Sequence, residues 1–136
     1  MVTYTAHHTH LTTAAPDKSV SFYTTVMGGK LVREAVLGGG AKAWDIDLGG
    51  LLIRISHVTG ADEALKREYD TARGKHQYGL HHIAMAVDNL DQAYQELSAK
   101  GAEFVLPPKG PLPESGLRIA FVRAPENVLF ELIEGE

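Results

Sequence analysis

Two histidines and one glutamate, far apart in the chain, could together bind a metal ion. His8 lies within one strand-like segment, His82 begins another, and Glu131 interrupts the apolar run Val128–Ile133. A lone carboxylate in an apolar strand is costly to bury unless it is paired or bound to a cation. Two imidazoles and one carboxylate suit Fe(II), Mn(II), Ni(II) or Zn(II) and leave positions open for substrate or water. Taken singly, each residue could instead be a hydrogen-bonded core or surface residue.

An internal repeat connects these positions. The glycine that ends a predicted helix follows His8 by 20 positions and follows His82 by 19. Arg54 follows His8 by 46 positions, and Glu131 follows His82 by 49. Repeated spacings of this kind indicate a fold made of two copies of one unit. His8 is therefore the predicted counterpart of His82, and Arg54 that of Glu131.

Each copy is predicted to contain a strand, a helix and three further strands. The alternation of apolar residues indicates the strands, and glycine and proline mark where elements end. The first comprises Tyr4–Thr13, a helix from Pro16 that Gly28 ends, Leu31–Leu37, Ala43–Leu48 and Leu51–Val58. The second comprises His82–Val87, a helix capped by Asp88 or Asn89 that runs through Lys100, Glu103–Leu106, Leu117–Val122 and Val128–Ile133, with Pro107–Gly116 as a loop. We expect module one at about residues 4–58, module two at about 80–136, and a linker at 59–79 with a candidate short helix at Asp62–Tyr69.

Composition excludes several classes of function. The 136 residues, 44% of them hydrophobic, predict a single domain spanning 1–136 with an ordinary core. A net charge of −4 without clustered lysine or arginine argues against nucleic acid as a partner. With no cysteine, any metal must be held by nitrogen and oxygen atoms. The sequence shows neither a secretory signal nor an apolar run that could span a bilayer, so we expect a cytoplasmic protein with no membrane partner.

The segments that carry these residues resemble the vicinal oxygen chelate superfamily, which includes glyoxalase I, extradiol dioxygenases, methylmalonyl-CoA epimerase, fosfomycin-resistance proteins and bleomycin-binding proteins. The similar segments are His8–Gly29, Gly79–Asp88 and Ile119–Ile133. The resemblance implies an α+β fold in which two paired βαβββ modules form a curved mixed sheet around a metal-containing cavity. It also implies a small-molecule substrate that binds through two neighbouring oxygens, and a homodimer.

The resemblance places metal ligands at His8, His82 and Glu131, with one divalent metal per site. Glyoxalase-type sites have a fourth ligand, Glu or Gln, where the repeat places Arg54. A guanidinium has no lone pair to donate, so Arg54 is expected to bind an anionic substrate group unless it is paired with a nearby acid. The extra His and Tyr of dioxygenases are missing from Gly116–Val122. The usual Asp-Pro-x-Gly turn is altered at 124–127, and the potassium-binding loop of the fosfomycin proteins is not recognisable.

The three-ligand set makes a ring-opening dioxygenase the first choice, with Fe2+ or Mn2+ favoured and Ni2+, Zn2+ or Co2+ as further candidates. The alternatives are a glyoxalase- or epimerase-like lyase or isomerase, a thiol transferase of the fosfomycin-resistance kind, and a metal-free protein that binds an antibiotic or metabolite.

Three further residues bear on the site. His10 is a candidate acid/base, since its ordinary pKa suits proton transfer near neutral pH, but it could equally be structural. Trp44 could wall a substrate pocket or belong to the core. Strand alternation predicts that His81 faces away from His82.

Overall fold

The computed structural model describes residues 1–69 and 78–135 of the chain. The chain divides into two compact units, Met1–Asp62 and Glu63–Glu136, which we call module one and module two. Residues 63–69 of the predicted linker therefore group with module two, and residues 70–77 lie outside the described part. No helix in the described ranges is long and apolar enough to cross a membrane.

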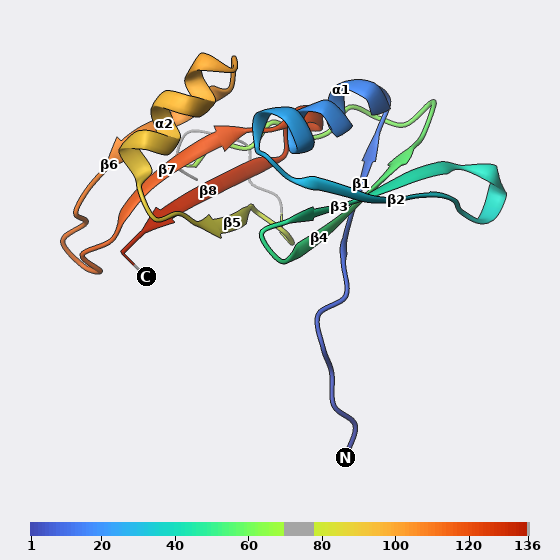
Figure 1. Cartoon of the computed structure of the whole chain (residues 1–136), viewed down its shortest axis with the longest axis horizontal. Coiled ribbons are helices and arrows are strands. Elements are labelled where there is room, and N and C mark those ends of the chain that lie inside the picture. The colour runs from blue at the N-terminus through green and yellow to red at the C-terminus, as the bar shows by residue number, and fades with distance from the viewer. Residues whose placement is uncertain (70–77, 136) are drawn as a thin grey trace. The chain divides into compact units, whose positions relative to one another are not determined.

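Module one contains one four-stranded mixed sheet with a short helical segment against it (Figure 1). Its elements are β1 (Thr9–Thr13), α1 (Pro16–Ser21), the π-helical turn η1 (Phe22–Val26), β2 (Lys30–Val36), the turn η2 (Gly38–Gly40), β3 (Lys42–Leu48) and β4 (Leu51–His57). The strand order is β1-β4-β3-β2, with β1 parallel to β4. Pro16 begins α1, where a missing N–H removes no helical hydrogen bond.

Module two repeats this arrangement. Its elements are β5 (Ile83–Ala86), α2 (Leu90–Ala99), β6 (Glu103–Lys109), β7 (Arg118–Arg123), the turn η3 (Pro125–Asn127) and β8 (Leu129–Glu134). The strand order is β5-β8-β7-β6, with β5 parallel to β8. Asn89 caps α2 by accepting a hydrogen bond from the Gln92 amide at 3.0 Å. The predicted α+β fold of two βαβββ modules is therefore confirmed.

Each module has its own apolar core. In module one the core includes Tyr23, Ile46, Ile53 and Ile55, all at most 1% exposed; in module two it includes Leu90, Val122, Phe130 and Leu132, all at most 2% exposed. Full burial of one such side chain stabilises a fold by roughly 1.5–3 kcal/mol. The alternate residues of the same strands face the other side of each sheet, which is where the polar candidates lie.

The strand register confirms the internal repeat. His10 on β1 lies opposite Arg54 on β4. Ala84 on β5 lies opposite Glu131 on β8 in the same parallel arrangement. Arg54 and Glu131 are thus equivalent. His8 lies two residues before His10, and His82 lies two residues before Ala84, so His8 and His82 are equivalent as well.

Several predicted elements differ from those in the structure. Residues 62–69 form no helix, because the carbonyls of Ala64 and Arg67 accept hydrogen bonds from the side chains of Asn127 and Arg123 instead of from a helical backbone. The edge strand β6 continues through Pro107 and Pro108, which an edge strand tolerates. Finally, β1 begins at Thr9 rather than at Tyr4, and β5 begins at Ile83 rather than at His82, so both candidate ligand histidines directly precede their strands.

Candidate metal centre

The C-terminal module brings two of the three predicted metal ligands together. His82 directly precedes β5, and Glu131 lies in the middle of the neighbouring β8. Their Nε2 and Oε2 atoms are 3.4 Å apart, and the Glu131 side chain is only 16% exposed. Glu131 faces away from the helix-covered side of the sheet, since Phe130 and Leu132 on either side of it belong to the core. The apolar run of β8 therefore carries its one carboxylate on the opposite face, beside an imidazole.

This pair has the chemistry and the spacing of two ligands to one divalent ion. Two donors bound at about 2.1 Å, at angles between octahedral and tetrahedral, lie about 3.0–3.4 Å apart. Within either module, over the described residues, no three His, Asp or Glu side chains gather in a metal-binding cluster. A complete site would need at least one further protein donor besides His82 and Glu131.

An aromatic ring packs against the candidate ligand His82. Phe121 on β7 lies opposite Glu131 in the register, and its ring meets the His82 ring nearly at right angles with centroids 5.3 Å apart. The Tyr69 ring lies 5.8 Å from Phe121. Neither residue was predicted from the sequence to lie near the candidate ligands. Pairing of the last two predicted strands could have placed Phe121 opposite Glu131. No sequence signal indicated that Tyr69 lies beside Phe121.

His81 contacts His82 directly. Their Nδ1 atoms are 2.9 Å apart, within hydrogen-bond distance. The prediction that His81 faces away is wrong, because both residues precede β5 and the alternation of side chains applies only inside a strand. The Nδ1 atom of His82 is thus engaged on one side, and its Nε2 atom points toward Glu131.

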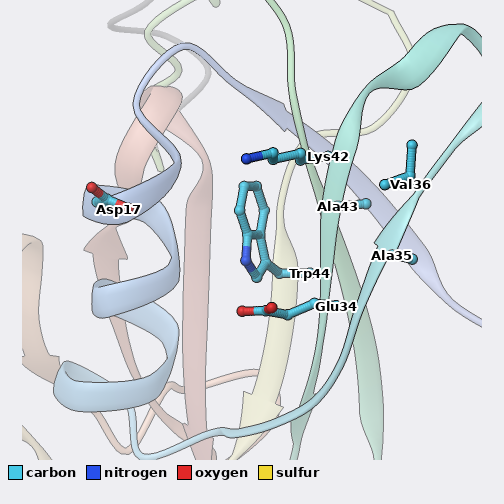
Figure 2. Close-up of a pocket in the computed structure, with 7 residues that line it drawn as sticks. All are labelled: Asp17, Glu34, Ala35, Val36, Lys42, Ala43 and Trp44. Carbon is cyan, nitrogen blue, oxygen red and sulfur yellow. The ribbon is translucent and has the colours of Figure 1, made fainter.

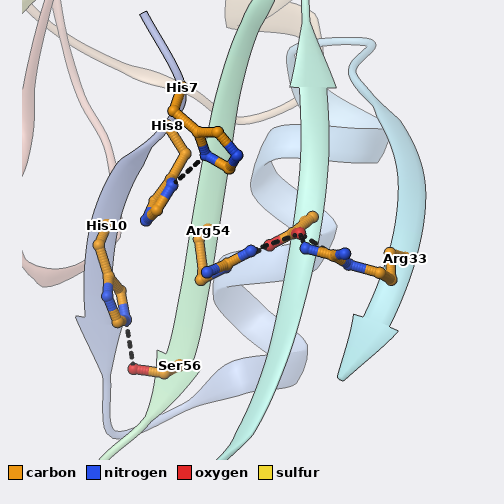
Figure 3. A network of polar contacts seen from close by, with 7 residues as sticks. His7, His8, His10, Arg33, Arg54 and Ser56 are labelled. Atoms are coloured by element: carbon orange, nitrogen blue, oxygen red, sulfur yellow. Dashed lines mark hydrogen bonds and ion pairs between the residues drawn. The ribbon is translucent and has the colours of Figure 1, made fainter. Parts of the chain in front are cut away.

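The N-terminal module has a similar arrangement around His8 (Figure 3). The Nδ1 atom of His8 lies 2.7 Å from Nδ1 of His7, and the His10 ring is centred 6.2 Å from the His8 ring. Nε2 of His10 forms a 2.8 Å hydrogen bond with Oγ of the buried Ser56. Desolvation and the nearby Arg54 guanidinium lower the pKa of His8 below 6.5. The neutral imidazole, which is the form that binds a metal, is therefore favoured.

Arg54 is held by a buried acid (Figure 3). Its Nε and Nη2 atoms donate to the two carboxylate oxygens of Asp45 at 2.8 and 3.0 Å, and Nε of Arg33 donates to the same carboxylate at 3.0 Å. The hydrogen bond from Arg54, helped by Arg33 and opposed by desolvation, lowers the pKa of Asp45 to about 2. Two guanidinium groups and one carboxylate leave this cluster with a net charge of +1.

Trp44 lies on the other face of the same sheet. It is paired with the core residue Ile55, whereas its neighbour Asp45 is paired with Arg54. Trp44 instead lines an open pocket of about 550 Å3 beside the start of α1, together with Asp17, Glu34, Ala35, Val36, Lys42 and Ala43 (Figure 2). The structure therefore does not bring Trp44 together with Arg54. If a substrate binds at Arg54, residues other than Trp44 must line that pocket.

Comparisons with known proteins show which family the chain belongs to. The glyoxalase/bleomycin resistance protein/dioxygenase superfamily profile matches residues 5–132. A probable lactoylglutathione lyase of Vibrio parahaemolyticus is 32% identical, over 95% of this chain and 89% of the relative. The lactoylglutathione lyase of Escherichia coli O157:H7 is 31% identical, over 93% and 90%.

Solved structures show the same fold. A glyoxylase/bleomycin resistance protein/dioxygenase domain from Frankia sp. is 26% identical with a TM-score of 0.74, covering 99% of this chain and all of that one (100%). The fosfomycin resistance protein FosX of Listeria monocytogenes, solved with Mn(II), has a TM-score of 0.72 over 99% of this chain and 95% of that one. At 19% identity, the likeness to FosX concerns the fold alone.

Proposed function

Because the chain belongs to the glyoxalase/bleomycin resistance protein/dioxygenase superfamily, we propose that it is a divalent-metal-dependent enzyme of the lyase or isomerase type. Its substrate would be a small molecule with two neighbouring oxygens. The observation that carries the proposal is the His82–Glu131 pair, whose 3.4 Å spacing suits two ligands of one metal ion. The lyase or isomerase type is supported over the dioxygenase, which the three-ligand set first favoured, by relatives named lactoylglutathione lyase that the alignments cover to 89% and 90% of their length.

His8 would complete the ligand set. It holds the register position equivalent to His82, its Nδ1 is engaged by His7 in the same way, and its pKa is lowered. Ni2+, Zn2+, Co2+, Mn2+ and Fe2+ all accept two imidazoles and a carboxylate. When bound, the metal acts as a Lewis acid toward substrate oxygens. Homodimer formation stays a prediction that follows from the resemblance.

His10 is the candidate acid/base of this site. Its Nε2 atom is engaged by Ser56, which fixes the orientation of the ring and leaves Nδ1 as the atom to exchange a proton with substrate. Its strand position, two residues beyond His8, places it on the same polar face as Arg54. A neutral imidazole can take a proton from a carbon next to a carbonyl and return it, as an isomerase requires.

The structure pairs Arg54 with the acid Asp45, which is the alternative that the sequence left open. We propose that Arg54 nevertheless recognises an anionic group of the substrate, through the positive charge that its cluster retains. Asp45 holds the guanidinium in one orientation, and the Arg33–Asp45–Arg54 cluster keeps a net positive charge. A preorganised guanidinium binds carboxylate or phosphate at less entropic cost than a free one. Since Arg54 replaces the fourth ligand of glyoxalase-type sites, we infer a substrate of the same general chemistry but with an added negative charge near the metal.

The test is a comparison of two reactions on protein loaded separately with Ni2+, Zn2+, Co2+, Mn2+ and Fe2+. The lyase or isomerase proposal predicts formation of lactoylglutathione, or of a related 2-hydroxy acid derivative from an anionic 2-oxo aldehyde adduct, and loss of that activity in Glu131→Gln. Oxygen consumption with a catechol and Fe2+, without any turnover of the 2-oxo aldehyde adducts, would instead establish the dioxygenase. Glu114→Gln, on an exposed residue, is the matched control.

A further inference from the structure

We propose that His81 and His7 are positioning residues that hold the metal-ligating histidines in the correct tautomer and orientation. In each module a histidine directly before the candidate ligand contacts it through Nδ1, so that the Nε2 lone pair of the ligand faces the metal. The inference rests on the proposed function, because it assumes that His82 and His8 bind a metal through Nε2.

The same contact occurs twice, in two segments 74 positions apart (82 minus 8). The Nδ1–Nδ1 distance is 2.9 Å for His81–His82 and 2.7 Å for His7–His8. The ring centroids are 5.1 and 5.0 Å apart, and the rings cross at 84° and 76°. Two pairs with the same geometry at equivalent places in the repeat indicate a shared structural role rather than one accidental contact.

Proton counting assigns the direction of each hydrogen bond. A neutral imidazole carries one N–H, so a histidine that offers Nε2 to a metal must carry its proton on Nδ1. The Nδ1–H of His82 then donates to Nδ1 of His81, which must accept and therefore carries its own proton on Nε2. The same reasoning makes His7 the acceptor for His8.

The packing around His82 favours this orientation. Phe121 meets the His82 ring edge-on at a centroid distance of 5.3 Å, and Nε2 lies 3.4 Å from Oε2 of Glu131. The ring is thus restrained by Phe121 and by His81 at Nδ1, and its Nε2 atom is directed toward the Glu131 carboxylate, with which it would share the metal. Partners that accept the second N–H of a ligating histidine fix its tautomer and raise its basicity, and their loss typically lowers metal affinity 10- to 100-fold.

The experiment measures Zn2+ affinity by competition with a chromophoric chelator in the full-length chain. His81→Ala is expected to weaken binding at least 10-fold. His81→Asn, whose amide oxygen can take the place of Nδ1 as acceptor, should restore the affinity to within a few-fold of the wild type, whereas His81→Phe should not. His7→Ala and His7→Asn are expected to behave in the same way. His57→Ala, at the end of β4 and in neither pair, is the control and should bind as the wild type does.

Long-range 1H–15N NMR of the Zn2+-loaded protein gives the second readout. It should show the Nδ1–H tautomer for His82 and the Nε2–H tautomer for His81. A contact that only packs the two rings together would not require this pair of tautomers. Wild-type affinity in His81→Ala, or an Nδ1–H tautomer for His81, would overturn the positioning role even though Zn2+ binds. If the wild type itself took up no Zn2+, the metal site of the proposed function would fail instead.

Discussion

Arg54 and Glu131 occupy equivalent positions, and their cross-strand neighbours explain why one is a cation and the other a candidate metal ligand. Opposite Arg54 lies Asp45, which forms a salt bridge with it; opposite Glu131 lies Phe121, which can form none. The Glu131 carboxylate lies beside an aromatic ring and an imidazole and has no guanidinium opposite it in the register. A bound cation would offset the cost of burying its charge. One residue difference in each of two neighbouring strands thus separates a salt-bridged position from a candidate metal-binding one.

At this scale we predict that Asp45→Asn destabilises module one and alters its acid unfolding. The pKa of Asp45 is lowered from 3.8 to about 2, so the folded state favours the carboxylate. The corresponding stabilisation, about 2 kcal/mol, is present above pH 3.8 and is lost as the pH falls toward 2. Urea unfolding should therefore show a lower stability of Asp45→Asn at pH 7 and a smaller loss of stability between pH 4 and 2.

Asp62→Asn, on an exposed residue, is the control and should leave both quantities unchanged. An Asp45→Asn variant with wild-type stability at pH 7 would show that the Arg33–Asp45–Arg54 cluster does not stabilise the fold. The Arg54 orientation that the proposed anion site requires would then lose its support.

At the scale of elements, the sequence predicted most of the fold because the relevant signals are local. Alternating apolar residues marked the strands, glycines marked the helix ends, and the helix starts were marked by Pro16 and by Asp88-Asn89, between which the sequence could not choose. The contact of His81 with His82 could not be predicted, since it depends on irregular backbone just before β5. Residues 63–69 were also misjudged, because long-range hydrogen bonds from Arg123 and Asn127 override their local helix propensity.

The turn from η1 into β2 gives a prediction about element packing. A Cβ added at Gly29 would lie 2.7 Å from the Tyr23 carbonyl oxygen and 2.8 Å from Cγ2 of Ile46, closer than real side chains approach. We expect Gly29→Ala to destabilise the protein by about 1–3 kcal/mol through overpacking. Gly38→Ala, where an added Cβ meets nothing within 4 Å, should change stability little. Equal thermal unfolding midpoints for the two variants would contradict this account of the turn.

At the scale of the whole molecule, the proposed ligands are distributed over both copies of the repeat: His8 belongs to module one, and His82 and Glu131 belong to module two. A ligand that binds only the folded state stabilises it by mass action, by about 2.7 kcal/mol when its free concentration is 100 times its dissociation constant. Metal binding should therefore stabilise the folded protein, and removal of a ligand from either module should weaken that stabilisation.

We predict that Zn2+ raises the unfolding temperature of the wild type but raises it far less in His8→Ala and in His82→Ala. His57→Ala should respond as the wild type does. A full Zn2+ response in His8→Ala, with none in His82→Ala, would mean that module two binds the metal without His8 and that the third ligand has been assigned wrongly.

The most direct test of the central claim is the metal content of the untagged protein after anaerobic purification, measured by inductively coupled plasma mass spectrometry. The proposal predicts close to one divalent metal per chain in the wild type and in Glu114→Ala, and almost none in His82→Ala and Glu131→Ala. A wild type that holds no metal and takes none up on reconstitution would contradict the claim, as would variants that keep a full complement.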